Sequence, residues 1–150
     1  MTTQKERDVF EKRTKEIIKD AAGKDPYAAD YLWMLMCISR TVDDIYDKDQ
    51  KISHEQVLTA VRYLLIELPF NPFFNKFRDT LTSQHVSMYN AWMAANTWEK
   101  GDETEQIYGH VWRDTHHEVV PVVALITQGP TQMRLVSQKI RKLFKKNLGE

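Results

Sequence analysis

The sequence predicts a single all-α domain over residues 1–150, a bundle of five to six helices with a buried central second helix. Apolar residues recur at steps of three and four along most of the chain. Apart from Gly109 and Pro121, Gly and Pro fall between those stretches or at their ends, and β-branched residues never alternate with polar ones for long, as a half-buried strand would require. A chain of 150 residues can bury a substantial core as one domain.

Composition narrows the classes of function. The 21 basic and 21 acidic residues cancel, so there is no overall attraction to nucleic acid or to an anionic membrane. One cysteine, Cys37, excludes both a disulfide framework and a cysteine metal site. The N-terminal residues are charged, and the longest apolar run is far below the ~20 residues of a membrane span. We expect a cytoplasmic protein with no membrane span and no nucleic-acid partner, and homo-oligomerisation is left open.

The first two helices have clear boundary signals. The first is expected over 3–22 as a covering helix, with Gly23 as its C-terminal stop. Asp25 and Pro26 are typical of a helix N-terminus, so the second helix is expected from Asp25 to Asp47. Residues 31–38 of that helix are all apolar, which predicts neighbours on most sides.

The next two helices are separated by Pro69. A capping box at Ser53 and Gln56 begins the third, over 53–68. Its predicted core face is broad and apolar: Val57, Leu58, Val61, Leu64, Leu65 and Leu68. The fourth and longest helix is expected from Asn71 to about Lys100, and its stripe of aromatic and apolar residues is interpreted as core rather than as a ligand pocket.

The fifth helix, over about 103–128, should run antiparallel to the fourth because the link between them is short. Gly109 would permit close approach of a neighbour, and Pro121 should kink the helix and free the carbonyl of His117. Gly129 and Pro130 precede the last helix, which has a narrow apolar stripe and is predicted to be a solvated cover rather than a nucleic-acid reader. Its basic residues are Lys139, Arg141, Lys142, Lys145 and Lys146.

Carboxylates gather at the C-terminal end of the second helix. Asp44 and Asp47 share a face with Arg40, and Asp43 lies at its edge. Acids this close repel one another, and the helix dipole at a C-terminus favours cations instead. A divalent cation such as Mg²⁺ or Mn²⁺ would relieve that repulsion, because hard ions prefer oxygen ligands. A solvated helix end is the other interpretation.

The segment ISRTVDDIYD resembles the first aspartate-rich segment of squalene and phytoene synthases, which are class I isoprenoid synthases. In that family such a helix faces a second acidic helix, and the two hold Mg²⁺ ions that bind a diphosphate. The resemblance carries this site to Asp43, Asp44 and Asp47. Residues 29–39 also resemble the acidic, apolar helix of all-α NTP pyrophosphohydrolases, where an ExxD motif binds metal. Asp30 matches the Asp of that motif, and Tyr27 stands in place of its Glu.

The fifth helix offers a second acidic wall. Asp114 and Glu118 lie one turn apart at the border of its apolar face, with His110 and His117 beside them as possible additional ligands. The first hypothesis is therefore Mg²⁺- or Mn²⁺-dependent binding, hydrolysis or transfer of a phosphate or diphosphate compound between the second and fifth helices. The residues expected to bind the phosphate are Arg40 and Arg113.

Two alternatives stay open. His110, Asp114, His117 and Glu118 could bind a transition metal, although the paired ExxH motifs of di-iron bundles are absent. The second alternative is a non-enzymatic helical protein that acts in protein interaction or as a structural component, with its acidic cluster in salt bridges. The sequence assigns no catalytic residue.

Overall fold

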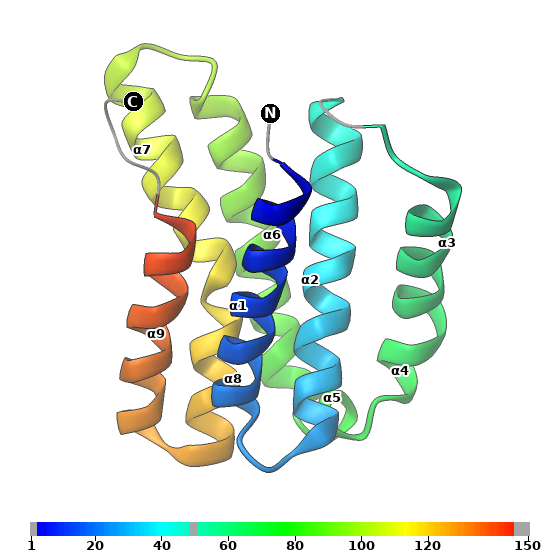
Figure 1. The fold of residues 1–150 in the computed structure, drawn as a ribbon. Coiled ribbons are helices and arrows are strands. Elements are labelled where there is room, and N and C mark those ends of the chain that lie inside the picture. Colours follow the sequence, from blue (N-terminus) through cyan, green and yellow to red (C-terminus); the bar gives the residue numbers. More distant parts are fainter. Residues whose placement is uncertain (1–2, 49–50, 146–150) are drawn as a thin grey trace. The chain divides into compact units, whose positions relative to one another are not determined.

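The computed structural model describes residues 3–48 and 51–145, and every regular element in those ranges is helical (Figure 1). The basic residue Lys146, assigned above to the last helix, lies outside them. In chain order the elements are α1 (Gln4–Ala22), α2 (Pro26–Asp47), α3 (His54–Arg62), the π-helix η1 (Tyr63–Glu67), α4 (Leu68–Phe70), α5 (Pro72–Lys76), α6 (Arg78–Trp98), α7 (Glu103–Asp114), the 3₁₀-helix η2 (Thr115–His117), α8 (Val119–Gln128) and α9 (Pro130–Phe144).

The all-α class is confirmed, and the described residues form seven helices of nine residues or more, namely α1, α2, α3, α6, α7, α8 and α9. This count exceeds the expected five to six because the predicted fifth helix divides into α7 and α8. The predicted fourth helix divides as well, into the short α5 and the long α6. Phe77 separates them with φ −115° and ψ 27°, outside the helical range. Its ring packs against that of Phe73 with centroids 5.0 Å apart, so the break lets an aromatic stripe turn into the protein interior.

The chain folds into two compact units. We call residues 24–78 the inserted unit, and we call the residues before and after it, 3–23 and 79–145 of the described chain, the terminal unit. Each is described by itself. The expectation of one domain over residues 1–150 stays a prediction.

Three helices, α1, α8 and α9, lie side by side and form the core of the terminal unit (Figure 1). The helices α1 and α9 contribute the apolar stripes that their sequences predict, whereas α8 buries Val120, Val123 and Ala124 beside the expected Val119. The buried side chains of these helices are Thr14, Ile17, Ile18, Ala21, Ala22, Val119, Val120, Pro121, Val123, Ala124, Val136 and Ile140. The edge of the Phe10 ring meets Phe144, with centroids 5.3 Å apart, which extends this packing toward the start of α1.

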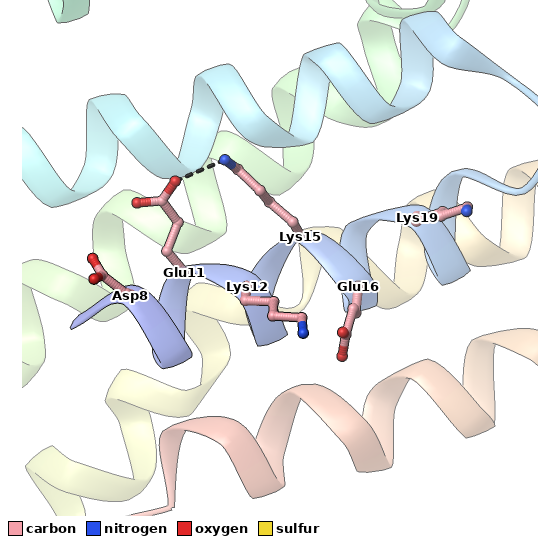
Figure 2. Close-up of a pocket in the computed structure, with 6 residues that line it drawn as sticks. All are labelled: Asp8, Glu11, Lys12, Lys15, Glu16 and Lys19. Carbon is pink, nitrogen blue, oxygen red and sulfur yellow. Dashed lines mark hydrogen bonds and ion pairs between the residues drawn. The ribbon is translucent and has the colours of Figure 1, made fainter. Parts of the chain in front are cut away.

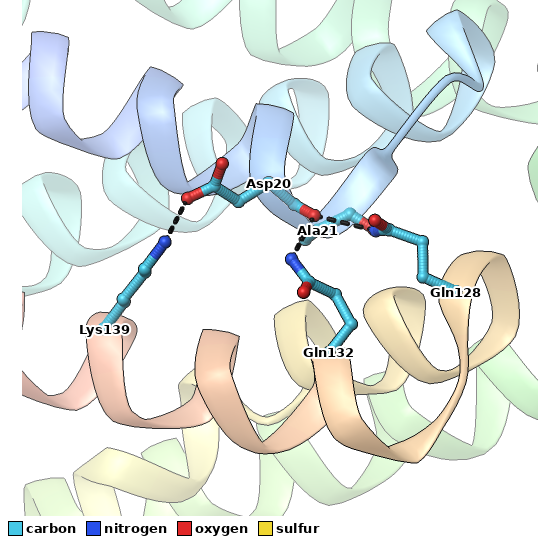
Figure 3. Close-up of polar contacts among 5 residues, drawn as sticks. All are labelled: Asp20, Ala21, Gln128, Gln132 and Lys139. Carbon is cyan, nitrogen blue, oxygen red and sulfur yellow. Dashed lines mark hydrogen bonds and ion pairs between the residues drawn. The ribbon is translucent and has the colours of Figure 1, made fainter.

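Polar side chains from α8 and α9 satisfy the last carbonyls of α1 (Figure 3). The carbonyl of Asp20 accepts hydrogen bonds from Gln128 at 2.8 Å and Gln132 at 3.1 Å, and the carbonyl of Ala21 accepts from Thr127 at 2.7 Å. These carbonyls have no partner within their own helix. The contacts therefore fix where α1 ends relative to α8 and α9.

Helices α6 and α7 run antiparallel across a tight turn, as the short link predicts (Figure 1). Asp102 caps α7 in a reciprocal box with Glu105. Gly109 is buried, and a Cβ there would lie 3.1 Å from the Cβ of Trp98 and 3.3 Å from the carbonyl oxygen of Ala95. The predicted close approach at Gly109 is thus confirmed, with α6 as the neighbour.

The predicted break in the fifth helix is also found, one turn before Pro121. The backbone tightens into η2, where the amide of Glu118 donates to the carbonyl of Thr115 at 3.2 Å, and α8 then begins at Val119. Proline has no amide hydrogen, and its ring collides with the carbonyl four residues earlier, here that of His117. The 3₁₀ turn is the local consequence.

In the inserted unit, the corner between α4 and α5 is held against the start of α2. The buried Asn71 caps α5 by accepting from the amide of Phe74 at 2.8 Å, and its amide donates to the carbonyl of Tyr27 at 3.0 Å. The ring of Tyr31 lies 5.9 Å from that of Phe73 between centroids. Fully buried positions of α2 are confined to residues 28–35 and Thr41, and the central place expected for this helix stays a prediction.

Candidate functional site

The acids at the end of α2 are held by local contacts within the inserted unit. Asp43 and Asp44 are half-buried, and Asp47 is exposed. Gln56 donates from Nε2 to Oδ2 of Asp44 at 2.8 Å, while Ser53 still caps α3 by accepting from the amide of Gln56 at 3.1 Å. The expected capping box is therefore half formed, because the Gln56 side chain joins α3 to α2 instead of returning to its own helix. Neither Asp43 nor Asp47 is without a partner.

The second predicted wall belongs to the terminal unit, and one of its two acids, Glu118, is paired there. Glu118 forms an ion pair with Arg141 of α9. Arg113, expected to bind phosphate, instead bonds to Oε1 of Glu99 at 2.9–3.0 Å and to Oδ1 of the buried Asn96 at 2.8 Å. Asp114 and His110 are half-buried, and Arg40, on α2, is exposed.

His117 is half-buried and packs against α9. Its ring stacks on that of Phe144 with centroids 3.7 Å apart and planes 14° apart. Burial, together with the neighbouring His116, Arg141 and Arg113, lowers the pKa of His117 to about 3. The imidazole is therefore neutral at physiological pH, and it contributes packing between η2 and α9.

The two acidic walls thus lie in different units, each with contacts of its own. Within residues 3–48 and 51–145, no three His, Cys, Asp or Glu side chains lie together in a way that could hold a metal ion. The Mg²⁺ or Mn²⁺ site, the transition-metal alternative and the phosphate-binding arginines stay predictions.

A depression of about 480 Å³ lies along the exposed side of α1 (Figure 2). Its lining contains charges of both signs, and Lys15 pairs with Glu11 at 2.7 Å although both side chains are about half exposed. The six lining residues are Asp8, Glu11, Lys12, Lys15, Glu16 and Lys19. Acids and lysines in equal number along one helix favour a solvated face, not a ligand site.

The strongest candidate is an apolar surface on the far side of α3, η1 and α4, which we call the outer face. Leu58 is 68% exposed, Leu65 is 69% exposed and Phe70 is 80% exposed, whereas residues buried in a core fall below a tenth. Smaller exposed fractions, between 46% and 55%, belong to Val61, Leu64 and Ile66. Six large apolar side chains, each at least 46% exposed, lie along this one helical segment, and exposed apolar surface of this kind marks interaction sites.

This finding corrects the predicted core face of the third helix. Val57 and Leu68 do turn inward, but Leu58, Val61, Leu64 and Leu65 are exposed. The reason is that the segment is apolar nearly all round, and within the inserted unit α2 covers only one side of it. An apolar residue becomes core only where a second element meets it.

The π-helix η1 lies in the middle of the outer face. Pro69 follows at once, and its ring collides with the carbonyl of Leu65 four residues earlier, which favours a widened turn. The amide of Leu68 accordingly donates to the carbonyl of Tyr63, five residues back. The same spacing places Nε of Arg62 3.2 Å from Oε1 of Glu67, and both side chains remain about half exposed. Such π-turns occur frequently at functional sites.

Sequence reasoning missed the outer face, although a signal was available. Residues 57–70 hold more apolar side chains than one helix face can carry, and the segment ends at Pro69. A surplus of apolar residues beyond a single stripe indicates a helix with two covered sides. Among the described residues of the inserted unit, α2 covers one of those sides.

No protein family, curated protein or solved structure matches this chain. None of the helices in the described residues combines the length and apolar character needed to cross a lipid bilayer. Function is therefore inferred from the chemistry of the chain's own residues.

Proposed function

We propose that this protein is a non-enzymatic helical protein that acts by protein association, and that its docking surface is the outer face. The observation that carries the proposal is the exposure of Leu58, Leu65 and Phe70 on one segment. Their neighbours Arg62 and Glu67 form a polar border beside the apolar centre. An apolar centre with a polar rim is the anatomy of protein–protein interfaces.

Free energy favours covering this surface. Full burial of one large apolar side chain contributes roughly 1.5–3 kcal/mol. Six side chains at 46–80% exposure therefore leave several kcal/mol of stabilisation unused in the isolated chain. A partner that covers them recovers this energy, less the cost of association. Aqueous solvent alone gives no reason to keep six such residues exposed along one short helical segment.

The acidic residues support the same class of function. The charges on Glu118 and Arg113 are compensated by Arg141 and Glu99. Asp44 has its hydrogen bond from Gln56. The ion pair of Glu118 supports a salt-bridged, non-enzymatic bundle, although its partner is Arg141 and not one of the expected arginines. The hydrogen bond from the neutral Gln56 stabilises the Asp44 carboxylate without a metal ion.

Binding of a hydrophobic fluorescent dye to the dilute protein tests the proposal. We expect strong dye fluorescence from the wild type and loss of most of it in the double variant Leu58→Gln, Leu65→Gln. The matched control changes two exposed leucines of the terminal unit, Leu125→Gln and Leu135→Gln, and should keep the signal. Both double variants should melt close to the wild-type temperature, because exposed positions contribute little to stability.

The contrary outcome is equally definite. If the Leu58 and Leu65 variant unfolds several degrees earlier and leaves dye fluorescence unchanged, the outer face is packed within the chain. Protein association through it would then be wrong.

A thermal-shift titration separates the metal hypothesis from this proposal. A metal that binds only the folded state at a hundredfold excess over its dissociation constant would add roughly 3 kcal/mol of stability. Under the association function, Mg²⁺ and Mn²⁺ leave the melting temperature unchanged. A rise with metal that Asp44→Asn abolishes would instead support a cation site at the end of α2.

A further inference from the structure

We propose that the partner of the outer face is a second copy of this chain, docked antiparallel about a two-fold axis. The axis passes beside Leu64 and Leu65, at the centre of η1. This inference rests on the proposed function and names its partner. Three properties of the face support it: the register of its residues, its balance of charge and its size.

The register is self-complementary. An axis between residues 64 and 65 brings Leu64 of one copy opposite Leu65 of the other. The same axis sets Leu58 near Phe70 of the second copy, which pairs the exposed residues at the two ends of the face. In an isologous interface every contact occurs twice. A face that is apolar at its centre and at both ends can therefore bind the same face of a second copy.

Charge obeys the same symmetry. Arg62 and Glu67 are equally distant from the proposed axis on opposite sides, so Arg62 of one copy lies opposite Glu67 of the second copy. In a single copy the two form an ion pair at 3.2 Å, with side chains 55% and 43% exposed. Two copies can share these four charges without placing like charges together. The formal charge of the whole chain is zero, so copies do not repel one another at long range.

The size of the face fits a dimer of this kind. The six exposed apolar side chains offer on the order of 500 Å² of surface. Neighbouring polar residues of α3 enlarge this toward the about 800 Å² per partner that stable interfaces bury. One acid and one base flank the apolar centre, so the face carries no excess of either charge. It therefore does not favour a strongly charged partner. A second copy therefore fits the face in register, charge and area.

Sedimentation equilibrium over a wide range of protein concentration measures the association. We expect a reversible monomer–dimer equilibrium in the wild type. Leu65→Glu places a charge at the centre of the interface and should weaken dimerisation by about a hundredfold or more. The matched control, Leu135→Glu, changes a leucine of α9 that is 50% exposed and should leave the dissociation constant unchanged.

Charge reversal tests the antiparallel register. Arg62→Glu and Glu67→Arg each place like charges opposite one another in a dimer of identical copies, so each should raise the dissociation constant several-fold. An equal mixture of the two variants should recover wild-type affinity. In the mixed dimer, the two acids of the first variant lie opposite the two bases of the second. Each substitution also removes the ion pair within one chain. The melting temperature of each variant in dilute solution measures how much stability that intrachain pair contributes.

The failures can be told apart. A wild type that stays monomeric at every concentration while its outer face still binds dye would overturn self-association but leave protein association through that face standing. A dimer that survives Leu65→Glu and is broken by Leu135→Glu would place the interface elsewhere and overturn the inference. If the mixture of the two charge-reversal variants does not recover wild-type affinity, the antiparallel register is wrong.

Discussion

The core of the terminal unit and the segment α3–η1–α4 are both rich in apolar side chains, yet they place them differently. In the terminal unit α1, α8 and α9 cover one another, and Val123 and Ile140 are at most 1% exposed. In the inserted unit α3 and η1 pack on α2 from one side only, and Leu65 is 69% exposed. The comparison teaches that apolar content alone does not make a core, because the number of covering neighbours decides what is buried.

The largest expected difference is in sensitivity to truncation. Ile140→Ala leaves a cavity in the terminal unit and should lower the free energy of unfolding by roughly 2–5 kcal/mol. Leu65→Ala removes a similar group from an exposed position and should change it by about 0.5 kcal/mol or less. Urea denaturation of dilute protein measures both. Equal losses would contradict the contrast between the two regions.

The second difference is in sensitivity to acid. The folded state holds the pKa of His117 at about 3, below its usual 6.5, so the unfolded state binds more protons between those pH values. Stability is complete above about pH 6.5 and falls as the pH falls toward 3, with a slope of at most about 1.4 kcal/mol per pH unit from this group.

His117→Gln should remove that part of the pH dependence, measured as the free energy of unfolding from pH 7 to pH 4. His54→Gln, at an exposed position of the inserted unit, is the matched control and should keep the wild-type slope. An unchanged slope in His117→Gln would show that the imidazole is accessible to protons in the folded state.

A smaller effect is expected where α6 meets α7. Gly109→Ala would bring a methyl group within 3.3 Å of backbone atoms of Ala95 and Glu99, which cannot rotate away. We expect a loss of about 1–3 kcal/mol, of the size found for overpacked sites. In a helix without this contact, Gly→Ala stabilises by up to about 1 kcal/mol. A higher melting temperature for Gly109→Ala would therefore disprove the close approach.

The smallest effect concerns the polar contacts at the end of α1. Lys139 pairs with Asp20 at 2.6 Å, but the two side chains are 52% and 41% exposed (Figure 3). Lys139→Met should change the free energy of unfolding by less than about 1 kcal/mol, and added salt should remove most of the difference. A loss as large as that of Ile140→Ala would mean that ion pairs, and not apolar packing, hold the terminal unit together.

Much of the fold could be predicted from the sequence, because helix boundaries depend on local chemistry. Asp25 accepts from the amides of Tyr27 and Ala28 at 2.9 and 3.2 Å, as its place before Pro26 predicts. The break at η2 follows from Pro121 in the same way. Such signals act within one turn of the chain, so they need no knowledge of tertiary structure.

Tertiary placement could not be predicted in the same way. No Gly or Pro lies at the break between α5 and α6, so the sequence does not predict it. The break occurs at Phe77, where the ring packs against that of Phe73. The sequence around Asp44 is the same whether this carboxylate binds a metal ion or accepts a hydrogen bond from Gln56. The hydrogen bond forms because α3 packs against α2, and local sequence does not reveal that packing. Four residues of the outer face, namely Leu58, Val61, Leu64 and Leu65, belong to the predicted apolar face because periodicity shows which residues can be buried, without showing whether a neighbour exists.

Carbene footprinting of the wild-type protein at increasing concentration tests the central claim most directly. In dilute solution the reagent should label Leu58, Leu65 and Phe70 strongly, and labelling should fall as the second copy covers them. Leu135 of α9 should stay equally labelled throughout, since it lies outside the proposed interface. Weak labelling of residues 58–70 even in the most dilute sample would show that the outer face is already covered within one chain, and would contradict the account.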